Sequence, residues 1–251
     1  MLNIHIREAG YPIKGGFDGQ RIAHILTEIH LSVSAGEIVA LVGESGCGKS
    51  TLGMSLVGLI PHVRGQISLD EKPIDLGCAT TGVRQIQYIF QDPMSALNPR
   101  MTIGQTFTEI MQQTGLQDGS ARDMINLIEL TDDVWYKYPH ELSGGQCQRA
   151  NIGRALLMRP LYLICDEIVS ALDVSVQAKI LNLLQKLVRR ENLGILFTTH
   201  DLHVVQSFAQ RVFIMKSGRI LEEGETRKVF AAPSHHYTKD LLAAAYPLRT
   251  I

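Results

Sequence analysis

The stretch "GESGCGKST", Gly43 to Thr51, follows the apolar run "EIVALV" and holds three glycines, one lysine and two hydroxyl residues next to it. Glycine lets the backbone turn tightly and present its N–H groups inward, with no Cβ in the way. The stretch matches the pattern GxxxxGK[ST], in which such a loop binds phosphate and opens a helix whose N-terminal end favours an anion. A plain strand-to-helix turn is the alternative, and other parts of a nucleotide site elsewhere in the chain would decide between the two.

The sequence on both sides of this loop favours the phosphate-binding interpretation. Residues 38–43, "IVALVG", form a short apolar run typical of a buried parallel strand, and "STLGMSLVGLI" has apolar residues at helical spacing, stopped near Pro61. In such a loop Lys49 reaches the β- and γ-phosphates and Ser50 is a ligand of Mg²⁺. We therefore predict that the whole loop contacts the nucleotide: Gly43, Glu44, Ser45, Gly46, Cys47, Gly48, Lys49, Ser50 and Thr51.

Two further segments supply what a nucleotide site needs. "LYLICDE", residues 161–167, is an apolar strand pattern that ends in Asp166 and Glu167, at the edge where parallel sheets bind ligands. We predict that Asp166 holds Mg²⁺, directly or through water, and that Glu167 is the general base or water-orienting carboxylate. His200 ends the strand pattern "GILFTTH" and is predicted to contact the γ-phosphate. The alternatives are two exposed acids at a strand end and a histidine with an ordinary structural role.

Composition and charge limit the classes of protein to consider. The chain has 251 residues, 45% hydrophobic and 20% charged, with a net charge of −1, which fits one α/β domain with or without a smaller lobe and gives no nucleic-acid footprint. The four cysteines have no CxxC spacing, so neither a zinc site nor a disulfide framework is expected. The apolar runs are shorter than the ~18 residues of a membrane span, and no signal peptide is recognised. We expect a soluble chain that another protein holds at a membrane if it works there.

The order of patterns predicts an α/β core with a helical lobe inserted into it. Strand patterns occupy residues 2–6, 30–33, 65–74 and 86–91, with a loop over 10–20. From Asp92 to about Pro160 the patterns are helical, including 103–115 and 121–130, the second capped by Ser120. A long amphipathic helix over 174–190, a strand over 194–200, a helix over 201–209 and a hairpin around Ser217-Gly218 follow, then a helical tail that frays.

The stretch "ELSGGQCQR", residues 141–149, is a second anion-binding design, a Ser-Gly-Gly at a helix start. A capped helix after a loop is the simpler interpretation. One chain does not need two phosphate cradles for one nucleotide, so the economical solution is a dimer in which this cradle covers the nucleotide of the other subunit.

At these residues the chain resembles the ATP-binding subunits of ABC transporters. "GESGCGKST" is similar to the Walker A motif, Gln91 to the Q-loop glutamine, "LSGGQ" to the signature, "LYLICDE" to Walker B, "SALD" at 170–173 to the D-loop and His200 to the switch histidine, all in the family's order. The resemblance implies the ABC ATPase fold: an α/β P-loop NTPase core with an antiparallel β subdomain and an inserted α-helical subdomain. It implies a core over 1–91 and 161–227, a helical subdomain over 92–160 and a helical tail over 228–251.

The resemblance also implies roles in a head-to-tail dimer that buries two ATP–Mg²⁺ between its subunits. Gln91 would be both a catalytic residue and a Mg²⁺ ligand. The signature residues of one copy would touch the γ-phosphate held by Lys49 of the partner subunit: Ser143, Gly144, Gly145 and Gln146.

A narrower match concerns importer ATPases for dipeptides, oligopeptides and nickel. "QDPMSALNPRMTIG" and the ending "HHYTKDLLAAAYP" are similar to segments of that group, and "YPIKGGFDGQ" resembles an insertion of its nickel-type branch. Tyr11 would then stack on adenine, although a surface tyrosine is an equal alternative. The implied partners are a paralogous second ATPase, two membrane permeases and an extracytoplasmic solute-binding protein, with no nucleic acid, at the cytoplasmic face of a bacterial plasma membrane. Nickel, a metal–chelator complex and peptides all remain open as cargo.

Two positions depart from the family pattern, and two rival functions remain. Ile168-Val169 stand where Pro-Thr is usual and Cys147 where a basic residue is common, so we expect an active but slower enzyme. One rival is a soluble translation-type ATPase, which usually carries two such cassettes in one chain, whereas this chain has one. The other rival is a soluble ABC-type ATPase of DNA repair or chromosome maintenance. Such chains insert coiled coils or zinc modules between the glycine loop and the signature, and residues 51–142 have neither heptads nor a cysteine pair.

Overall fold

A six-stranded sheet forms the centre of the computed structural model, which describes residues 1–13, 21–74, 85–115 and 119–246. The strand order is β10-β9-β3-β8-β7-β6, with β10 antiparallel at one edge and the other five strands parallel. The strands are β3 (Ile38–Val42), β6 (Ile86–Ile89), β7 (Tyr162–Asp166), β8 (Gly194–Thr199), β9 (Arg211–Lys216) and β10 (Arg219–Glu225). Every residue of β3, β7 and β8 is buried, which explains why these strands read as continuous apolar runs.

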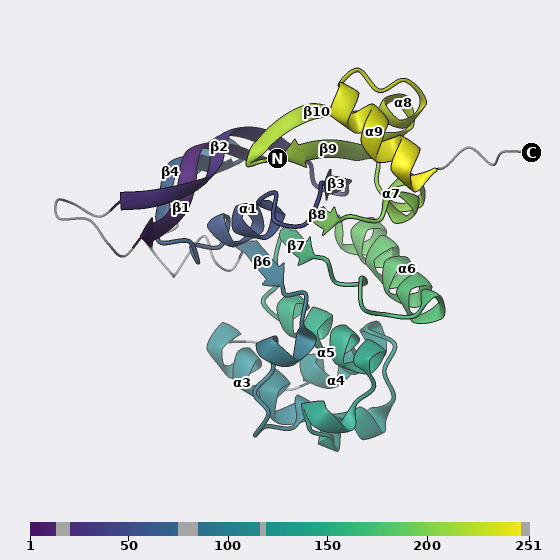
Figure 1. Ribbon diagram of the computed structural model, residues 1–251. Helices are drawn as coiled ribbons and strands as arrows, with labels where there is room; N and C mark the ends of the chain where they lie inside the picture. Colours follow the sequence, from purple (N-terminus) through teal and green to yellow (C-terminus); the bar gives the residue numbers. More distant parts are fainter. Residues whose placement is uncertain (14–20, 75–84, 116–118, 247–251) are drawn as a thin grey trace, which may run out of the picture.

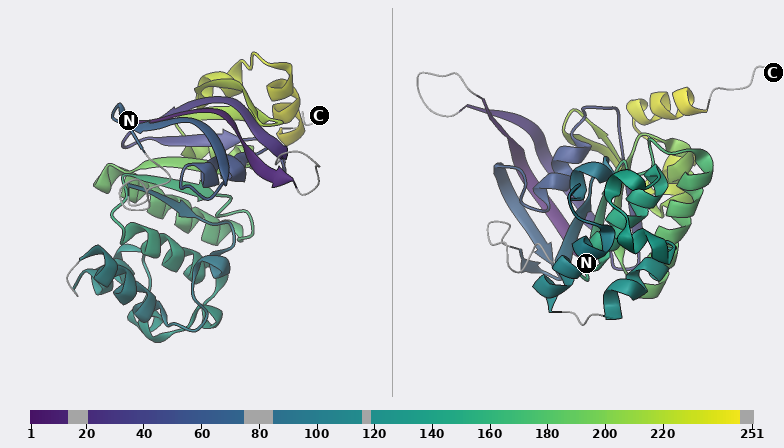
Figure 2. Two further views of the ribbon diagram at one scale, coloured as in Figure 1. Left: turned by 90° about the vertical axis from the view of Figure 1, so that its left-hand side faces the viewer. Right: turned by 90° about the horizontal axis from the view of Figure 1, so that it is seen from below.

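A second, antiparallel sheet lies at one end of the molecule, with strand order β2-β1-β4-β5 (Figures 1 and 2). Its strands are β1 (Leu2–Ile13), β2 (Arg21–Val33), β4 (His62–Leu69) and β5 (Lys72–Pro73). One face is apolar and buried, including Ile4, Ile29 and Ile67, while the alternate residues face outward. Helix α1 (Lys49–Ser55) packs between the two sheets, against β1, β2 and β7 (Figure 1).

The chain between β6 and β7 is helical and lies at the end of the molecule opposite the antiparallel sheet (Figures 1 and 2). It contains η1 (Pro93–Ala96), α3 (Ile103–Thr114), α4 (Gly119–Leu127), η2 (Asp132–Tyr136), η3 (Pro139–Glu141) and α5 (Gly144–Leu156). The remaining helices are α6 (Val174–Glu191), α7 (Leu202–Phe208), α8 (Thr226–Ala231) and α9 (His236–Ala245). Thr102 begins α3 with a capping box, since its hydroxyl accepts from the N–H of Gln105 while the Gln105 side chain accepts in return.

Two apolar cores occupy the two faces of the central sheet. Because side chains alternate along a strand, Val39 and Leu41 join the core shared with α1 and the antiparallel sheet. Ile38 and Ala40 join the larger core, which continues into α3, α5, α6 and α7. The central sheet therefore fixes the position of both flanking layers.

The predicted fold class is confirmed, and most of the predicted elements are found, but several boundaries were wrong. β1 continues through Gly10 to Ile13, where the sequence favours a loop. A Cβ on Gly10 would meet the carbonyl oxygen of Ala23 at 1.9 Å, and the register shifts between Ala9 and Gly10, so this glycine serves close strand approach rather than a turn. The rest of the predicted loop, residues 14–20, lies outside the described residues.

Two helix predictions also needed correction, and one helix was not predicted. α1 ends at Ser55, well before Pro61, and Gly58 in the turn that follows has a φ of 72°. α4 begins at Gly119, so Ser120 lies inside the helix rather than at its N-cap. α8 has no counterpart among the predicted elements. The predicted frayed end falls largely on residues 247–251, outside the described residues.

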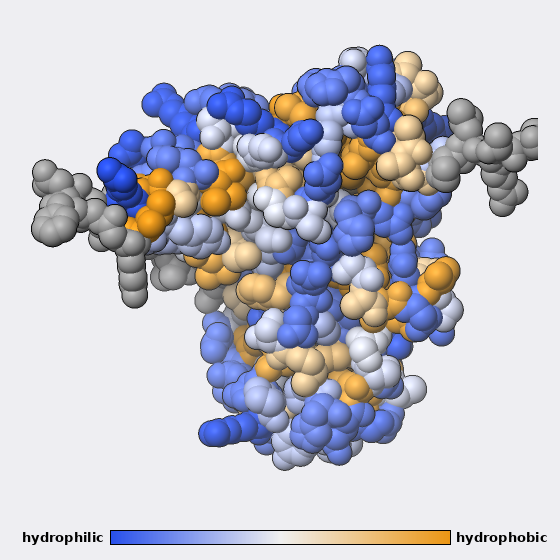
Figure 3. Space-filling model, viewed as in Figure 1, coloured by the Kyte–Doolittle hydropathy of each residue, from blue (hydrophilic) through white to orange (hydrophobic). Residues whose placement is uncertain are grey.

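Of the helices in the described part of the chain, none is both long and apolar enough to cross a bilayer. In the face shown in Figure 3, apolar side chains occur as separate patches among hydrophilic ones.

Truncating Leu184 tests the larger core. The side chain is fully buried on α6, so Leu184→Ala should lower the free energy of unfolding by about 2–5 kcal/mol, through lost apolar contact and the cavity left behind. Asn182→Ala, on the exposed side of the same helix, should change it by less than about 0.5 kcal/mol. Chemical denaturation measures both, and equal effects would contradict the burial of this helix face.

Candidate functional site

The parallel strands bring the predicted site segments to one edge of the central sheet. Val42, the last residue of β3, pairs with Thr199 of β8, and Asp166 at the end of β7 pairs with Thr198. The glycine loop, Glu167 and His200 therefore begin side by side, each just past the end of its strand. β8 lies between β3 and β7, so His200 comes from the strand between the other two.

The glycine loop is held by backbone contacts. Gly46 and Gly48 have φ values of 80° and 112°, which non-glycine residues rarely adopt. A Cβ on Gly43 would lie 2.3 Å from the carbonyl oxygen of Met215. The N–H of Gly218, in the β9–β10 turn, donates to the carbonyl of Cys47 at 2.8 Å. Residues 44–46 are exposed, so this part of the loop is open to a ligand.

Lys49 is buried at the centre of the site. Its Nζ donates to the carbonyls of Gly43 at 2.8 Å and Glu44 at 3.2 Å, and lies 3.3 Å from Oε1 of Glu167. The other oxygen of Glu167, Oε2, is 3.2 Å from Nδ1 of His200. The Lys49 and Glu167 side chains are 4% and 14% exposed, whereas His200 is 55% exposed. The structure thus joins three of the predicted residues in one chain of contacts.

Glu167 adopts an uncommon backbone conformation, with a φ of 48°. Its N–H donates to the carbonyl of Thr198 at 3.1 Å, and the Ser170 hydroxyl donates to its carbonyl at 2.9 Å. Ile168 and Val169, which stand where the resembled family has Pro-Thr, are 2% and 3% exposed and belong to the larger core. Apolar burial and these hydrogen bonds therefore hold the turn that aims Glu167.

Asp166 is buried and held by two hydroxyl groups that sequence reasoning missed. Tyr88 of β6 donates to its Oδ2 at 2.6 Å, and Thr198 of β8 donates to its Oδ1 at 2.5 Å. Burial, followed by the Asp166 carboxylate, raises the pKa of Tyr88 far above its usual value, and the Ser50 hydroxyl has a smaller opposing effect. Tyr88 therefore stays a neutral donor. In the sequence these two residues are marked only as hydroxyl-bearing side chains within apolar strand patterns, Tyr88 in "IQYIFQ" and Thr198 in "GILFTTH".

The predicted signature residues lie at the start of α5, apart from this cluster. Ser143 caps the helix, accepting from the N–H of Gln146 at 3.3 Å, and the Gln146 side chain accepts from the N–H of Ser143 at 3.0 Å. Gly145 packs against Val176, and Gly144 is exposed. Within the described chain, no hydrogen bond or ion pair joins residues 143–146 to residues 43–51. Within one subunit the two anion-binding segments thus make no direct polar contact with each other among the described residues.

Gln91 and Tyr11 are both exposed. Gln91 lies two residues beyond the end of β6, at the same edge of the sheet as Asp166. Tyr11 is 39% exposed on β1 and lies near enough to Tyr88 to add a small upward shift to its pKa.

The thiols of the site region are protected by burial. Burial raises the pKa of Cys47 in the glycine loop and raises that of Cys147 to about 11. Cys147, which stands where the resembled family often has a basic residue, has its Sγ 3.5 Å from Sδ of Met94 and joins α5 to η1. Cys47 and Cys147 therefore act as packing groups rather than nucleophiles.

Oxygen donors and buried polar groups fit a nucleotide with a hard cation. Ser50, Asp166 and Gln91 offer a hydroxyl, a carboxylate and an amide oxygen, the donor types that Mg²⁺ prefers. The loop of residues 43–49 has no room for a Cβ at Gly43, and its last residue, Lys49, supplies a buried ammonium group.

The comparisons with known proteins identify the family of the chain. The family model described as ABC transporter matches residues 26–170. A Brucella ovis protein named for peptide import and ATP binding is 43% identical over 228 residues, which are 88% of this chain and 72% of the relative. The oligopeptide transport ATP-binding protein OppF of Salmonella typhimurium is 42% identical, over 86% of this chain and 67% of its own.

Solved structures show the same fold. CbiO1 from Clostridium perfringens, part of the ABC transporter complex CbiONQ, superposes with a TM-score of 0.75 at 29% identity, over 92% of this chain and 90% of its own. The dimeric ATP-binding cassette MJ0796 with bound ADP and Pi gives a TM-score of 0.75 at 28% identity, over 90% of this chain and 99% of its own.

Removing the Tyr88 hydroxyl tests the support of Asp166. Tyr88→Phe leaves a buried carboxylate with one donor fewer, so the free energy of unfolding should fall by about 1–3 kcal/mol. The matched control is Tyr138→Phe, a tyrosine that is 38% exposed, which should change it by less than about 0.5 kcal/mol. Equal values for the two variants in urea denaturation would show that the Tyr88 contact does not stabilise the protein.

Proposed function

Because the chain belongs to the ABC transporter family and is an ATPase of that family, we propose that it energises an importer of peptides through partner membrane subunits. The observation that carries this proposal is the contact chain from Lys49 through Glu167 to His200 at the mouth of the glycine loop. The Brucella relative and OppF are both named for peptides, so peptide is the proposed cargo rather than nickel.

ATP binding exchanges the partners of Lys49. The ammonium leaves Glu167 for the β- and γ-phosphates, which carry more negative charge, while the backbone N–H groups of residues 43–51 surround the phosphates. Ser50, Gln91 and Asp166 would hold Mg²⁺, which supplies charge neutralisation between the phosphates. Tyr11 stacks on adenine in this proposal.

Glu167 is released by the same exchange and becomes available to a water molecule. It accepts a proton from that water, or orients it, for in-line attack on the γ-phosphate. His200, which already contacts Oε2 of Glu167, would donate to the γ-phosphate and keep the carboxylate in place. Asp166 stays fixed by Tyr88 and Thr198, so the two neighbouring acids have different duties.

A second subunit completes each nucleotide site. The separation of Ser143–Gln146 from the glycine loop within one chain supports this, as does the dimeric cassette among the similar structures. The N-terminus of α5, where Ser143 and Gly144 are exposed, would face the γ-phosphate bound by the facing subunit. The facing subunit is a paralogous ATPase in this proposal.

Closure of the dimer moves the helical subdomain, residues 92–160, relative to the core, residues 1–91 and 161–227, and the tail, 228–251. Gln91 and the segment from Asp92 to Arg100 pass this motion to two permease subunits. The assembly lies at the cytoplasmic face of a bacterial plasma membrane and receives peptide from an extracytoplasmic binding protein. Uptake of a labelled oligopeptide and of Ni²⁺ by cells with and without this chain tests the cargo: loss of nickel uptake alone would refute peptide import.

Replacing the proposed base should separate binding from hydrolysis. Glu167→Gln keeps the size of the side chain but removes its basicity, so the steady-state ATPase rate should fall by at least about 100-fold while ATP still binds. Lys49→Ala should instead weaken nucleotide binding. Glu191→Gln, an exposed acid at the end of α6, is the control and should keep the wild-type rate. A Glu167→Gln enzyme with full activity would show that another group is the base.

Adding a charge to the signature should affect only the assembled dimer. A Cβ on Gly144 would meet only Leu172 at 3.6 Å, so a side chain fits without disturbing the fold. Gly144→Asp places a carboxylate toward the facing γ-phosphate, and the ATPase rate should fall by roughly 100-fold while the monomer's ATP affinity changes little. Gly144→Ala is the size control. Equal hydrolysis in all three proteins would argue against a shared site.

A further inference from the structure

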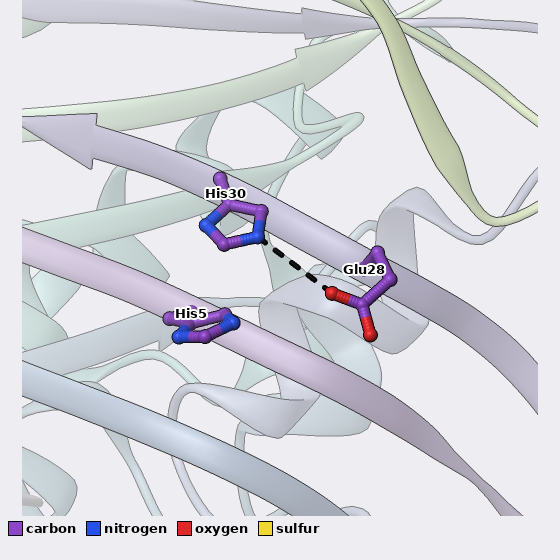
Figure 4. Close-up of side chains that lie close together, drawn as sticks. All are labelled: His5, Glu28 and His30. Carbon is purple, nitrogen blue, oxygen red and sulfur yellow. Dashed lines mark ion pairs between the residues drawn. The ribbon is translucent and has the colours of Figure 1, made fainter.

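The outer face of the antiparallel sheet carries a cluster of three side chains of metal-ligating types, outside the segments of the nucleotide site. His5 of β1 is directly opposite His30 of β2, so their side chains share one face of the sheet. Glu28 is two residues before His30 on the same strand. Figure 4 shows the two imidazole rings one above the other, with the Glu28 carboxylate beside them.

The geometry of these three side chains suits a shared ligand. The ring centroids of His5 and His30 are 4.1 Å apart and their planes differ by 27°. Nε2 of His30 is 3.8 Å from Oε2 of Glu28, and one ligand atom from each of the three residues lies within 4.8 Å of the others. Tetrahedral ligation at 2.0–2.1 Å needs ligand atoms roughly 3.4 Å apart. Side-chain rotations that move the ligand atoms by about 1 Å would bring them to that spacing.

The backbone at this cluster is irregular. Glu28 has a φ of 50° in the middle of a strand, an uncommon conformation for a residue other than glycine. On the other side of β1 the register with β4 shifts after Ile6, at Gly65, where a Cβ would lie 2.2 Å from the carbonyl oxygen of His5. Such irregularities redirect side chains on a sheet and occur often beside functional sites.

We propose that His5, Glu28 and His30 form a binding site for a divalent transition-metal ion of the zinc class, with water completing the coordination. Two imidazoles and one carboxylate are the donor set that Zn²⁺ and its neighbours Ni²⁺ and Cu²⁺ accept, whereas Mg²⁺ prefers oxygen donors alone. The bound ion crosslinks β1 to β2 and replaces the contact of two stacked imidazoles with a shared cation. This site is independent of the proposed transport function, because none of its residues lies at the glycine-loop edge of the central sheet.

A neighbouring group on the same sheet provides the control. Glu8 is 3.3 Å from His24 and 3.5 Å from His62, but Arg64 also lies 3.0 Å from its carboxylate. The guanidinium already neutralises that acid and would repel a metal ion. The Glu8 group therefore has similar residue types without a suitable site.

Zinc binding to the full chain tests the proposal. Isothermal titration with ZnCl₂, without nucleotide, with excess Mg²⁺ and in a Cys78→Ser background, should give one site. Cys47, Cys147 and Cys165 are buried, which limits their competition for the ion. His30→Gln and Glu28→Gln should each weaken zinc affinity by at least about tenfold, whereas His24→Gln and His62→Gln should leave it unchanged. Both His30 and Glu28 are more than half exposed, so these variants should fold.

Thermal unfolding gives a second readout, because an ion that binds only the folded protein raises the melting temperature. Zinc should raise it in the wild-type and His24→Gln proteins and should have a much smaller effect on His30→Gln. Zinc affinity that is unchanged in His30→Gln, or equally reduced in His62→Gln, would overturn the proposed site. ATPase activity is not a readout here, so a failure would leave the transport proposal untouched.

Discussion

Burying the ammonium of Lys49 is the constraint on which the site depends. An ammonium ion taken out of water costs several kcal/mol unless its three donors find acceptors. Here the acceptors are the carbonyls of Gly43 and Glu44 and the carboxylate of Glu167. The glycine loop must therefore curl so that the carbonyls of Gly43 and Glu44 face the Lys49 ammonium. Glu167, just past the end of β7, must point toward this ammonium as well.

Both requirements show in the backbone. The loop contains two glycines with positive φ, and Glu167 itself has a φ of 48°. Hydrogen bonds and apolar burial around Ile168 and Val169 offset the cost of this conformation. The Glu167 carboxylate is thereby paired with Lys49, and in the proposed mechanism it becomes available to water when phosphate takes its place.

The central sheet links the position of the Lys49 site to the packing of the rest of the molecule. Its two faces belong to two separate cores, one with α1 and the antiparallel sheet and one with the helices. Strand register at the carboxyl edge sets the spacing of the glycine loop, Asp166 and His200, so a shift of either core relative to the sheet would move the site. The β9–β10 turn adds a direct hold, through the bond from Gly218 to Cys47.

The sequence alone determined the parts whose signals are local. Buried parallel strands read as apolar runs, and the glycine pattern before Lys49 has few other uses, so the fold class and the residues of the loop could be predicted. It could not supply what depends on residues far apart in the chain: the place of β8 between β3 and β7, the hydroxyls of Tyr88 and Thr198 on Asp166, or the pairing of His5 with His30. Those contacts arise from strand order and register, which are set by the packing of whole layers. For the same reason the sequence favours a loop at Gly10, since only the partner strand reveals that the glycine makes room for a neighbouring carbonyl.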